Sequence, residues 1–331
     1  MKKYPAPHIK REMNVALIYP NVLAALLPAA VAAVYYYGIR ALMILLTGMF
    51  FMSAGEFVFV RYLRKQKYVW DASSLVSGAI FALILPPTVP LWLVILGALF
   101  ASVVVKQCFG GLGCNLLNPA LAATAFLSVA FPSFMSVYAE PLTSRWTIAS
   151  LFSGAAAAVS SATPAAAKSG VLLFDLFSGR YPGAIGETCA IAILIGGAYL
   201  LWLGILRFGA PLTYLILLAA GTWAFDGIPA VPGVLLTGGV LIGAVFAMGD
   251  YTTTPISGSG RVIFGAGAAI LTLIIRQFGN PSYAVGFSIL AMNTLTPILD
   301  FYIRPRVFSM PNWFSKKAEE NKVTRKEPEI L

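Results

Sequence analysis

The feature that most constrains the fold of this sequence is a series of long, nearly continuous apolar runs. Hydrophobic residues make up 59% of the 331 positions and charged residues 11%, about half the charged fraction of an ordinary soluble domain. The runs are rich in Leu, Ala and Ile and lack the alternation of polar and apolar residues that β-barrel strands show. Their backbone groups must therefore be paired within helices. The sequence predicts an all-α integral membrane protein.

Ten apolar runs are candidates for transmembrane helices, although several are short. A helix rises 1.5 Å per residue and needs about 20 residues to cross a bilayer. Residues 86–90, Pro-Pro-Thr-Val-Pro, cannot be helical and separate two of the runs. The expected spans are 15–37, 40–60, 73–85, 91–105 and 119–131 in the first half, then 184–206, 211–225, 234–248, 262–275 and 283–299 in the second.

The two halves share an ordered set of motifs, which predicts an internal repeat. Each half has a glycine after a hydroxyl residue, a proline-bearing break, an apolar run, a basic residue followed by Gln and Phe-Gly, and an asparagine. Chance recurrence of glycine and proline is the alternative. Five spans per half would place the halves in inverted orientation. The expected units are a tail at 1–14, repeats at 15–132 and 183–303, a loop at 133–182, and a basic tail at 304–331.

The distribution of positive charge predicts the orientation in the membrane. Lysine and arginine accumulate on the cytoplasmic side of membrane proteins. With the N-terminus inside, most of the 23 Lys and Arg residues would face the cytoplasm. We therefore expect both termini to be cytoplasmic and the loop at 133–182 to be external. The net charge of +10 is explained by this distribution, so we expect no nucleic-acid partner.

Polar breaks that are paired across inverted halves are where transporters place their central sites, because freed helix ends offer dipoles and unpaired carbonyls. Tight turns between short helices are the structural alternative. For the glutamate near the sixth span, capping of a helix N-terminus is the alternative. The candidates for an ion pathway or central site are Asn115, Asn118, Glu187, Asp250 and Asn293.

Motifs of soluble enzymes are absent from the sequence. It has no Walker loop and no dinucleotide fingerprint, and it indicates no catalytic residue. Cys108, Cys114 and Cys189 lack the spacing of metal ligands, so we expect no metal site and expect these cysteines to be small packing residues. Composition and pattern alone indicate a channel or transporter.

Two stretches are specific enough to carry a family resemblance. They are LPPTVPLW at 85–92 and KQCFGGLGCNLLNPAL at 106–121, with further matches at 7–9, 186–188, 254–255 and 275–279. Together they cover nearly the whole chain. The sequence resembles the RnfD/NqrB family, which comprises membrane subunits of the Rnf and sodium-pumping NADH:quinone oxidoreductase complexes. Its length and short N-terminal tail are more similar to the RnfD branch.

The resemblance implies a covalently bound FMN, held as a phosphoester by a threonine in a loop that ends Ser-Gly-Ala-Thr. The matching residues are Ser160, Ser161, Ala162 and Thr163. Ser161 replaces the usual glycine, and Ala157 stands where an acidic residue commonly precedes the motif, which bears on recognition by the flavin transferase. A bland loop of small residues is the alternative. The resemblance also leaves room for a noncovalent riboflavin between spans, at a place that the sequence does not indicate.

The function implied by the resemblance is that of a membrane subunit in a ferredoxin:NAD oxidoreductase, where flavins carry electrons and the complex moves Na+ or H+. Such a subunit would be inactive alone and would lie in a bacterial or archaeal cytoplasmic membrane. Its partners would be other membrane subunits, a second FMN-bearing subunit, iron–sulfur and NADH-binding subunits, and a flavin transferase. The alternatives are an NqrB-like subunit of a quinone reductase and a stand-alone channel or transporter.

Overall fold

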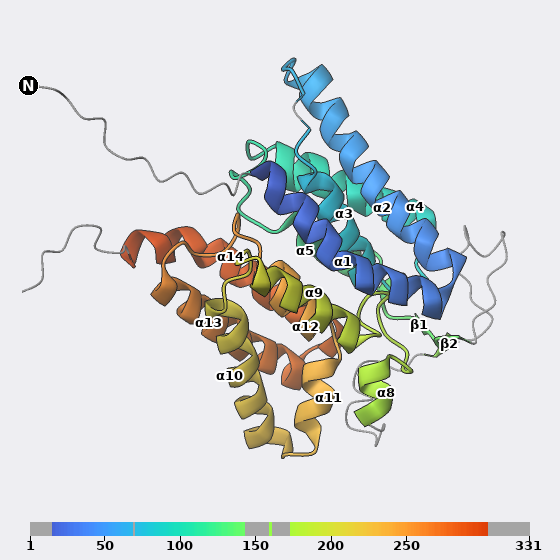
Figure 1. The fold of residues 1–331 in the computed structure, drawn as a ribbon, viewed down its shortest axis with the longest axis vertical. Coiled ribbons are helices and arrows are strands. Elements are labelled where there is room, and N and C mark those ends of the chain that lie inside the picture. Colours follow the sequence, from blue (N-terminus) through green and yellow to red (C-terminus); the bar gives the residue numbers. More distant parts are fainter. Residues whose placement is uncertain (1–14, 69, 143–158, 161–172, 304–331) are drawn as a thin grey trace, which may run out of the picture.

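The computed structural model describes residues 15–68, 70–142, 159–160 and 173–303, which form a helical bundle with one small sheet (Figure 1). The first half contains α1 (Val15–Tyr37), α2 (Ile39–Val58), η1 (Phe59–Leu63), α3 (Ser73–Ile84), α4 (Leu91–Leu99), η2 (Phe100–Gln107) and α5 (Pro119–Ala130). The connection contains α6 (Pro132–Met135), β1 (Tyr138–Ala139), β2 (Val159–Ser160) and α8 (Leu173–Ser178). The second half contains α9 (Ala190–Trp202), α10 (Gly209–Asp226), α11 (Ala230–Leu236), α12 (Val240–Ile242), η4 (Gly243–Ala247), α13 (Gly258–Phe278), η5 (Pro281–Tyr283) and α14 (Ala284–Tyr302).

Several helices are long and apolar enough to cross a membrane, which confirms the all-α membrane class for the described residues. Four pass this test alone, and α11 with α12–η4 passes as a pair bent by 59°. The expected spans at 73–85, 91–105, 119–131 and 184–206 form shorter helices, so the ten spans and the inverted repeat stay predictions. The four long spans are Leu17–Tyr37, Ile39–Leu63, Gly258–Phe278 and Pro281–Tyr302.

Helix α3 ends inside the bundle because the prolines at 86, 87 and 90 cannot continue it. The last carbonyl groups of a helix have no partner within the helix. Here the backbone N–H of Gly186 donates to the carbonyl of Leu83 at 2.8 Å, and that of Ile185 donates to the carbonyl of Leu85 at 3.0 Å. A Cβ atom at Gly186 would lie 2.7 Å from Cβ of Leu83. Only glycine therefore allows this approach without a shift of the backbone.

A buried guanidinium group stabilises the same break. Arg40, near the start of α2, is fully buried. Its Nε donates to the carbonyl of Pro87 at 3.0 Å, and its Nη2 donates to the carbonyl of Val89. Both carbonyls lie just beyond the C-terminal end of α3, where the helix dipole favours a positive charge. Arg40 therefore pairs acceptors that water cannot reach.

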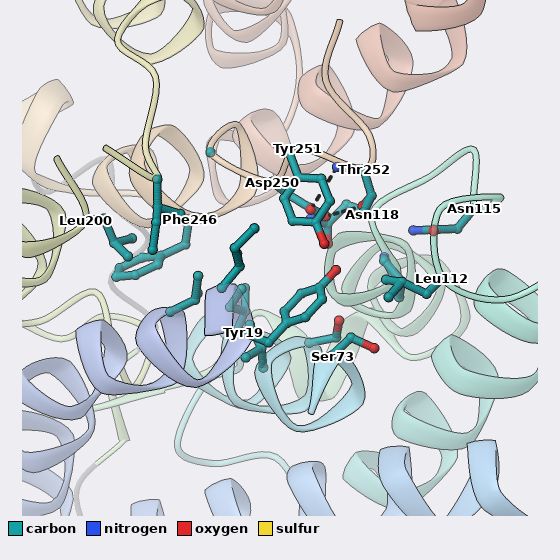
Figure 2. Close-up of a pocket in the computed structure, with 18 of the residues that line it drawn as sticks. Tyr19, Ser73, Leu112, Asn115, Asn118, Leu200, Phe246, Asp250, Tyr251 and Thr252 are labelled. Carbon is teal, nitrogen blue, oxygen red and sulfur yellow. Dashed lines mark hydrogen bonds between the residues drawn. The ribbon is translucent and has the colours of Figure 1, made fainter. Parts of the chain in front are cut away.

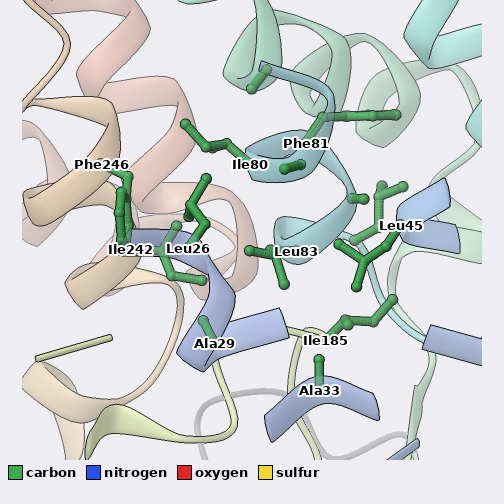
Figure 3. Packing of buried hydrophobic residues seen from close by; sticks show 14 of the residues in the cluster. Leu26, Ala29, Ala33, Leu45, Ile80, Phe81, Leu83, Ile185, Ile242 and Phe246 are labelled. Carbon is green, nitrogen blue, oxygen red and sulfur yellow. The ribbon is translucent and has the colours of Figure 1, made fainter. Parts of the chain in front are cut away.

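The apolar core joins α3 to α1, to α9 and to the broken pair α11–α12. Figure 3 shows Leu26 of α1 between Ile80 of α3 and the side chains of Ile242 and Phe246 on α12–η4. Close packing of α1 against α9 depends on Gly196, because a Cβ atom there would overlap the carbonyl of Ala25. The two halves of the chain therefore share one apolar core.

The expectation that the cysteines are packing residues is wrong for two of the three. Cys108 and Cys114 are exposed, and Cys189 is half-buried. The first two flank a turn after η2 in which Gly110, Gly111 and Gly113 have positive φ. The turn carries the chain across the surface of the bundle, so its small apolar residues do not enter the core.

We predict that Arg40→Met destabilises the fold by about 3 kcal/mol, because two buried carbonyl groups lose their donors at a cost of roughly 1–3 kcal/mol each. Thermal unfolding of the full chain in detergent measures the effect. Arg61→Met, which removes an exposed arginine of η1, is the control and should have little effect. Equal stability of the two variants would show that Arg40 does not hold the break.

Candidate functional site

Two small cavities lie end to end along α3. The first, of about 40 Å³, is lined by Ser73, Ser77, Ile80 and Asp250, among others. The second, of about 50 Å³, is lined by Ile84, one helical turn further along α3, and by Glu187. We call them the Asp250 cavity and the Glu187 cavity. Both are polar enough and large enough to hold a few water molecules or an ion.

The carboxylate of the Asp250 cavity lies in the break between η4 and α13. Thr252 donates to it from its backbone N–H at 3.1 Å and from its hydroxyl at 2.9 Å. Burial raises the pKa of Asp250 above its ordinary value, against the effect of these hydrogen bonds. Tyr19 and Tyr251 close the cavity with ring centroids 6.0 Å apart and hydroxyls that point toward each other (Figure 2).

Two predicted asparagines also line the Asp250 cavity, and they differ in how they are bonded. Asn118 caps α5, because its Oδ1 accepts from the backbone N–H groups of Ala120 at 3.1 Å and Leu121 at 3.4 Å. Asn115 donates to the carbonyl of Leu117 at 3.4 Å, while its buried Oδ1 has no partner in the described part of the chain. Asn115 is therefore the free acceptor, and the role of Asn118 is largely structural.

A buried ion pair joins the wall of the Asp250 cavity. Nζ of Lys106 lies 2.9 Å from Oε2 of Glu56 and donates to the hydroxyls of Ser73 at 2.5 Å and Ser74 at 3.0 Å. Gln107 donates to the other carboxylate oxygen at 2.6 Å. Lys106 itself lines the cavity. Burying two charges is costly unless they are paired and hydrogen-bonded. Here the ammonium group of Lys106 donates to three oxygen atoms, so its hydrogen-bonding capacity is fully used.

The Glu187 cavity contains three oxygen atoms that lack partners among the described residues. They are Oε1 of Glu187, Oγ of Ser282 and Oη of Tyr283, and all three are buried. The backbone N–H groups of Ala184 and Gly239 interact with the Glu187 carboxylate. Gly239 has φ of 71°, a conformation that favours glycine. Helix α9 begins at Ala190 without a side-chain cap, so Glu187 does not cap that helix through a hydrogen bond, whereas Gly239, which interacts with its carboxylate, is the N-cap residue of α12.

An apolar layer about one helical turn thick separates the two cavities. On α3 it is formed by Ile80 and Ile84, and on α12–η4 by Ile242 and Phe246. Three of these four are buried and Ile84 is half-buried, and Figure 3 shows Ile80 opposite the second pair. Leu121 of α5 borders the Glu187 cavity from the same layer. Polar groups therefore lie on both sides of this apolar layer.

The fifth predicted residue, Asn293 on α14, lies in neither cavity. With its amide turned to suit its neighbours, its oxygen accepts from the backbone N–H of Asn118 at 3.2 Å and its nitrogen donates to the carbonyl of Thr253 at 3.2 Å. The two asparagines that the sequence pattern pairs across the halves are therefore in contact. Their contact holds the start of α5 against the Asp250 break.

Sequence reasoning missed Ser282, Tyr283 and the pairing of Glu56 with Lys106. The two hydroxyl residues follow Asn280-Pro281 at the start of a span, where polar residues are common, so no signal marked them. Glu56 and Lys106 are 50 positions apart, and only the presence of opposite charges in neighbouring apolar runs hinted at a pair. Of the predicted flavin motif, Ser160 lies in β2, while Ser161, Ala162 and Thr163 lie outside the described residues.

These features define the class: a helical membrane protein with broken helices and two buried polar cavities in series. Comparison with known proteins places it further, because residues 3–309 match the NQR2, RnfD, RnfE family. The chain belongs to this family.

Three relatives illustrate the family. Over 92% of this chain it is 37% identical to the D-type subunit of the Na+-translocating ferredoxin:NAD+ oxidoreductase complex of Acetobacterium woodii, covering 94% of that protein. It is 31% identical to the corresponding subunit of the proton-translocating complex of Clostridium ljungdahlii, with 92% and 94% covered. It is 32% identical to the corresponding subunit of an ion-translocating oxidoreductase complex of Citrobacter koseri, with 92% and 97% covered.

We predict that Lys106→Met alone destabilises the protein by about 3–5 kcal/mol, because it leaves the Glu56 carboxylate buried without its countercharge. The double variant Glu56→Gln/Lys106→Met removes both charges and should recover much of that loss. Unfolding of the four proteins of this double-mutant cycle in detergent gives the coupling free energy. If the two substitutions simply add, the ion pair does not stabilise the cavity wall.

Proposed function

We propose that this chain is the D-type membrane subunit of a ferredoxin:NAD+ oxidoreductase complex that translocates Na+ or H+. The main support is the family match over residues 3–309, together with relatives that are D-type subunits of ion-translocating complexes. The subunit would act only within the complex. The expected partners are the other membrane subunits, a second FMN-bearing subunit, and the iron–sulfur and NADH-binding subunits.

The two cavities support a path for the ion through this subunit. Each holds one carboxylate next to a helix break, Asp250 in one and Glu187 in the other. Hard cations prefer oxygen ligands, and the Glu187 cavity offers carboxylate and hydroxyl oxygens that have no other partner among the described residues. The apolar layer between the cavities would keep the path closed until α3 or α12–η4 moves. Alternating occupancy of the two cavities is the transport step that this arrangement supports.

The covalent flavin is the second part of the proposal. FMN held at Thr163 would accept one or two electrons and pass them between carriers of the complex. The described residue nearest in sequence, Ser160, pairs with Tyr138 in the small sheet, and Thr88 donates to the carbonyl of Val137 at 2.6 Å. The segment before the motif is therefore anchored to the break that follows α3. This anchoring suits a loop that must present a cofactor at a fixed place.

The proposed orientation follows from the charge distribution. Both tails would be cytoplasmic and the flavin loop external, in a bacterial or archaeal cytoplasmic membrane. The start of α1 and the end of α14 both adjoin the Asp250 break, through Tyr19 beside Tyr251 and through Asp300, which accepts from the N–H of Ile256 at 3.0 Å. The Asp250 cavity would therefore be the cytoplasmic one.

We predict that Glu187→Gln and Asp250→Asn each lower redox-driven ion uptake by at least about tenfold, because each removes the charged ligand of one cavity. A loss of about 1.4 kcal/mol in the free energy of ion binding corresponds to a tenfold loss of affinity. Uptake of 22Na+ or of protons into vesicles that contain the whole complex is the measurement, with ferredoxin-dependent NAD+ reduction followed in parallel. Asp226→Asn, at an exposed carboxylate outside both cavities, is the control. Full uptake in both cavity variants would place the ion path in another subunit.

We predict a covalent flavin on Thr163 when the chain is produced together with its flavin transferase. A denaturing gel under ultraviolet light should show a fluorescent band that disappears in Thr163→Val, because valine offers no hydroxyl for the phosphoester. Ser160→Ala should keep its fluorescence, since that hydroxyl is not the attachment point. A dark band for the wild-type chain would contradict the flavin relay and leave the ion path untouched.

A further inference from the structure

A third cavity, which the proposed function does not use, lies where α10 and α13 begin. It has a volume of about 350 Å³, and its lining includes Arg207, Arg261, Tyr251 and Thr254. The rest of its wall is mainly small or apolar, with Ile205 and Met248 among the lining side chains. We call it the arginine cavity. It is several times larger than either of the other two.

The two guanidinium groups differ in how firmly they are held. Arg261 donates from Nε to the carbonyl of Pro255 and from Nη2 to that of Ile256, both at 2.9 Å, which fixes its plane. Its Nη1 makes no hydrogen bond within the described residues. Arg207 is exposed and also makes none there. The cavity therefore presents donors that are free to bind a ligand from solution or from the membrane.

The charges at the cavity favour an anion. The two arginines repel each other, and Asp300 offsets part of the charge of Arg261, so the local balance stays positive. The starts of α10 and α13 are adjacent, because a Cβ atom at Gly209 would lie 3.2 Å from Cβ of Arg261. The positive ends of both helix dipoles therefore lie together and add to the field. Guanidinium groups bind phosphate oxygens well because two parallel N–H donors match them.

Large exposed apolar side chains lie in the segments that line the cavity. Trp202 is 82% exposed, Phe208 60% and Ile256 73%. The first two lie near Arg207 in sequence and the third lies near Arg261. Tryptophan side chains are enriched at membrane–water interfaces, so the exposed Trp202 is suited to such a position. A ligand whose phosphate meets the arginines would therefore have apolar side chains beside it, ready to contact an acyl chain.

We propose that the arginine cavity binds the phosphate group of an anionic phospholipid, with Arg207 and Arg261 as the phosphate ligands and the acyl chains lying against the exposed apolar side chains. The cavity is open and large enough for a headgroup. A lipid bound here would contact the start of α13 and, through Tyr251, the wall of the Asp250 cavity. The bound lipid would thus be a structural component of the subunit in its membrane.

Native mass spectrometry of the full chain in detergent tests this proposal. Wild-type protein titrated with phosphatidylglycerol should bind it at least about tenfold more tightly than phosphatidylcholine, since only the former has a net negative charge. Arg207→Gln/Arg261→Gln should weaken phosphatidylglycerol binding by roughly thirtyfold. This value assumes that each arginine contributes about 1 kcal/mol to the binding of anionic lipid. Arg207→Gln alone, at an exposed side chain that cannot affect folding strongly, should weaken it by about fivefold.

The matched control is Arg61→Gln/Lys67→Gln, which removes two exposed positive charges outside the cavity and should leave binding unchanged. Equal affinity of wild-type protein for the two lipids would overturn the proposal, and so would an equal loss in the control. Inorganic phosphate is added in a third arm. If it binds on its own and displaces the lipid at millimolar concentration, the ligand is a soluble phosphate compound and the lipid assignment is wrong.

Discussion

The structure depends on how the backbone groups of helices that end inside the bundle are paired. Hydrocarbon offers no water to an orphan carbonyl, so each broken helix needs a donor from elsewhere in the protein. Arg40 and the segment 185–186 supply donors at the end of α3. At the end of α11, Arg276 donates to the carbonyls of Val234 and Thr237, both at 3.2 Å. These two breaks are thus each stabilised by a guanidinium group, and because they are stable, polar cavities can exist beside them.

Much of this could be read from the sequence, and the rest depends on distances that no pattern encodes. Continuous apolar runs predicted the helical membrane class, and the prolines at 86–90 predicted the break. The expectation that polar residues near the breaks gather at central sites led to Asp250 and Glu187, each of which lines a cavity. Sequence could not separate Asn115, whose Oδ1 has no partner among the described residues, from Asn118, whose Oδ1 caps a helix. Both are asparagines just before α5, and either could fill either role. It also placed the cysteines inside, because the glycines around Cys108 and Cys114 indicate a turn but do not indicate whether that turn lies on the surface.

The arrangement of the two cavities limits how an ion could cross. Ile80, Ile84, Ile242 and Phe246 form a dry layer, and an ion cannot enter such a layer without losing its hydration at a cost of several kcal/mol. In the proposed path a helix would therefore have to move, and α12–η4 has features that suit this: two glycines with positive φ precede α12, and η4 is itself a π-helical segment. Such segments are frequent at functional sites because their backbone geometry is less regular. The same segment carries two of the four blocking side chains, Ile242 and Phe246.

If the loop carries the proposed flavin, its redox chemistry would influence this layer only through a mechanical connection, and hydrogen bonds among the described residues provide a short one. β2 pairs with β1, and the carbonyl of Val137 next to β1 accepts from Thr88 in the break after α3. Leu83 and Leu85 at the end of α3 are bonded in turn to Gly186 and Ile185, beside Glu187. A displacement of the small sheet would therefore reach the break, the last turn of α3 with Ile84, and the carboxylate of the Glu187 cavity together. Because these hydrogen bonds fall on residues 83, 85 and 88, this short stretch at the end of α3 is the place through which a change in the loop would reach both the apolar layer and the Glu187 cavity.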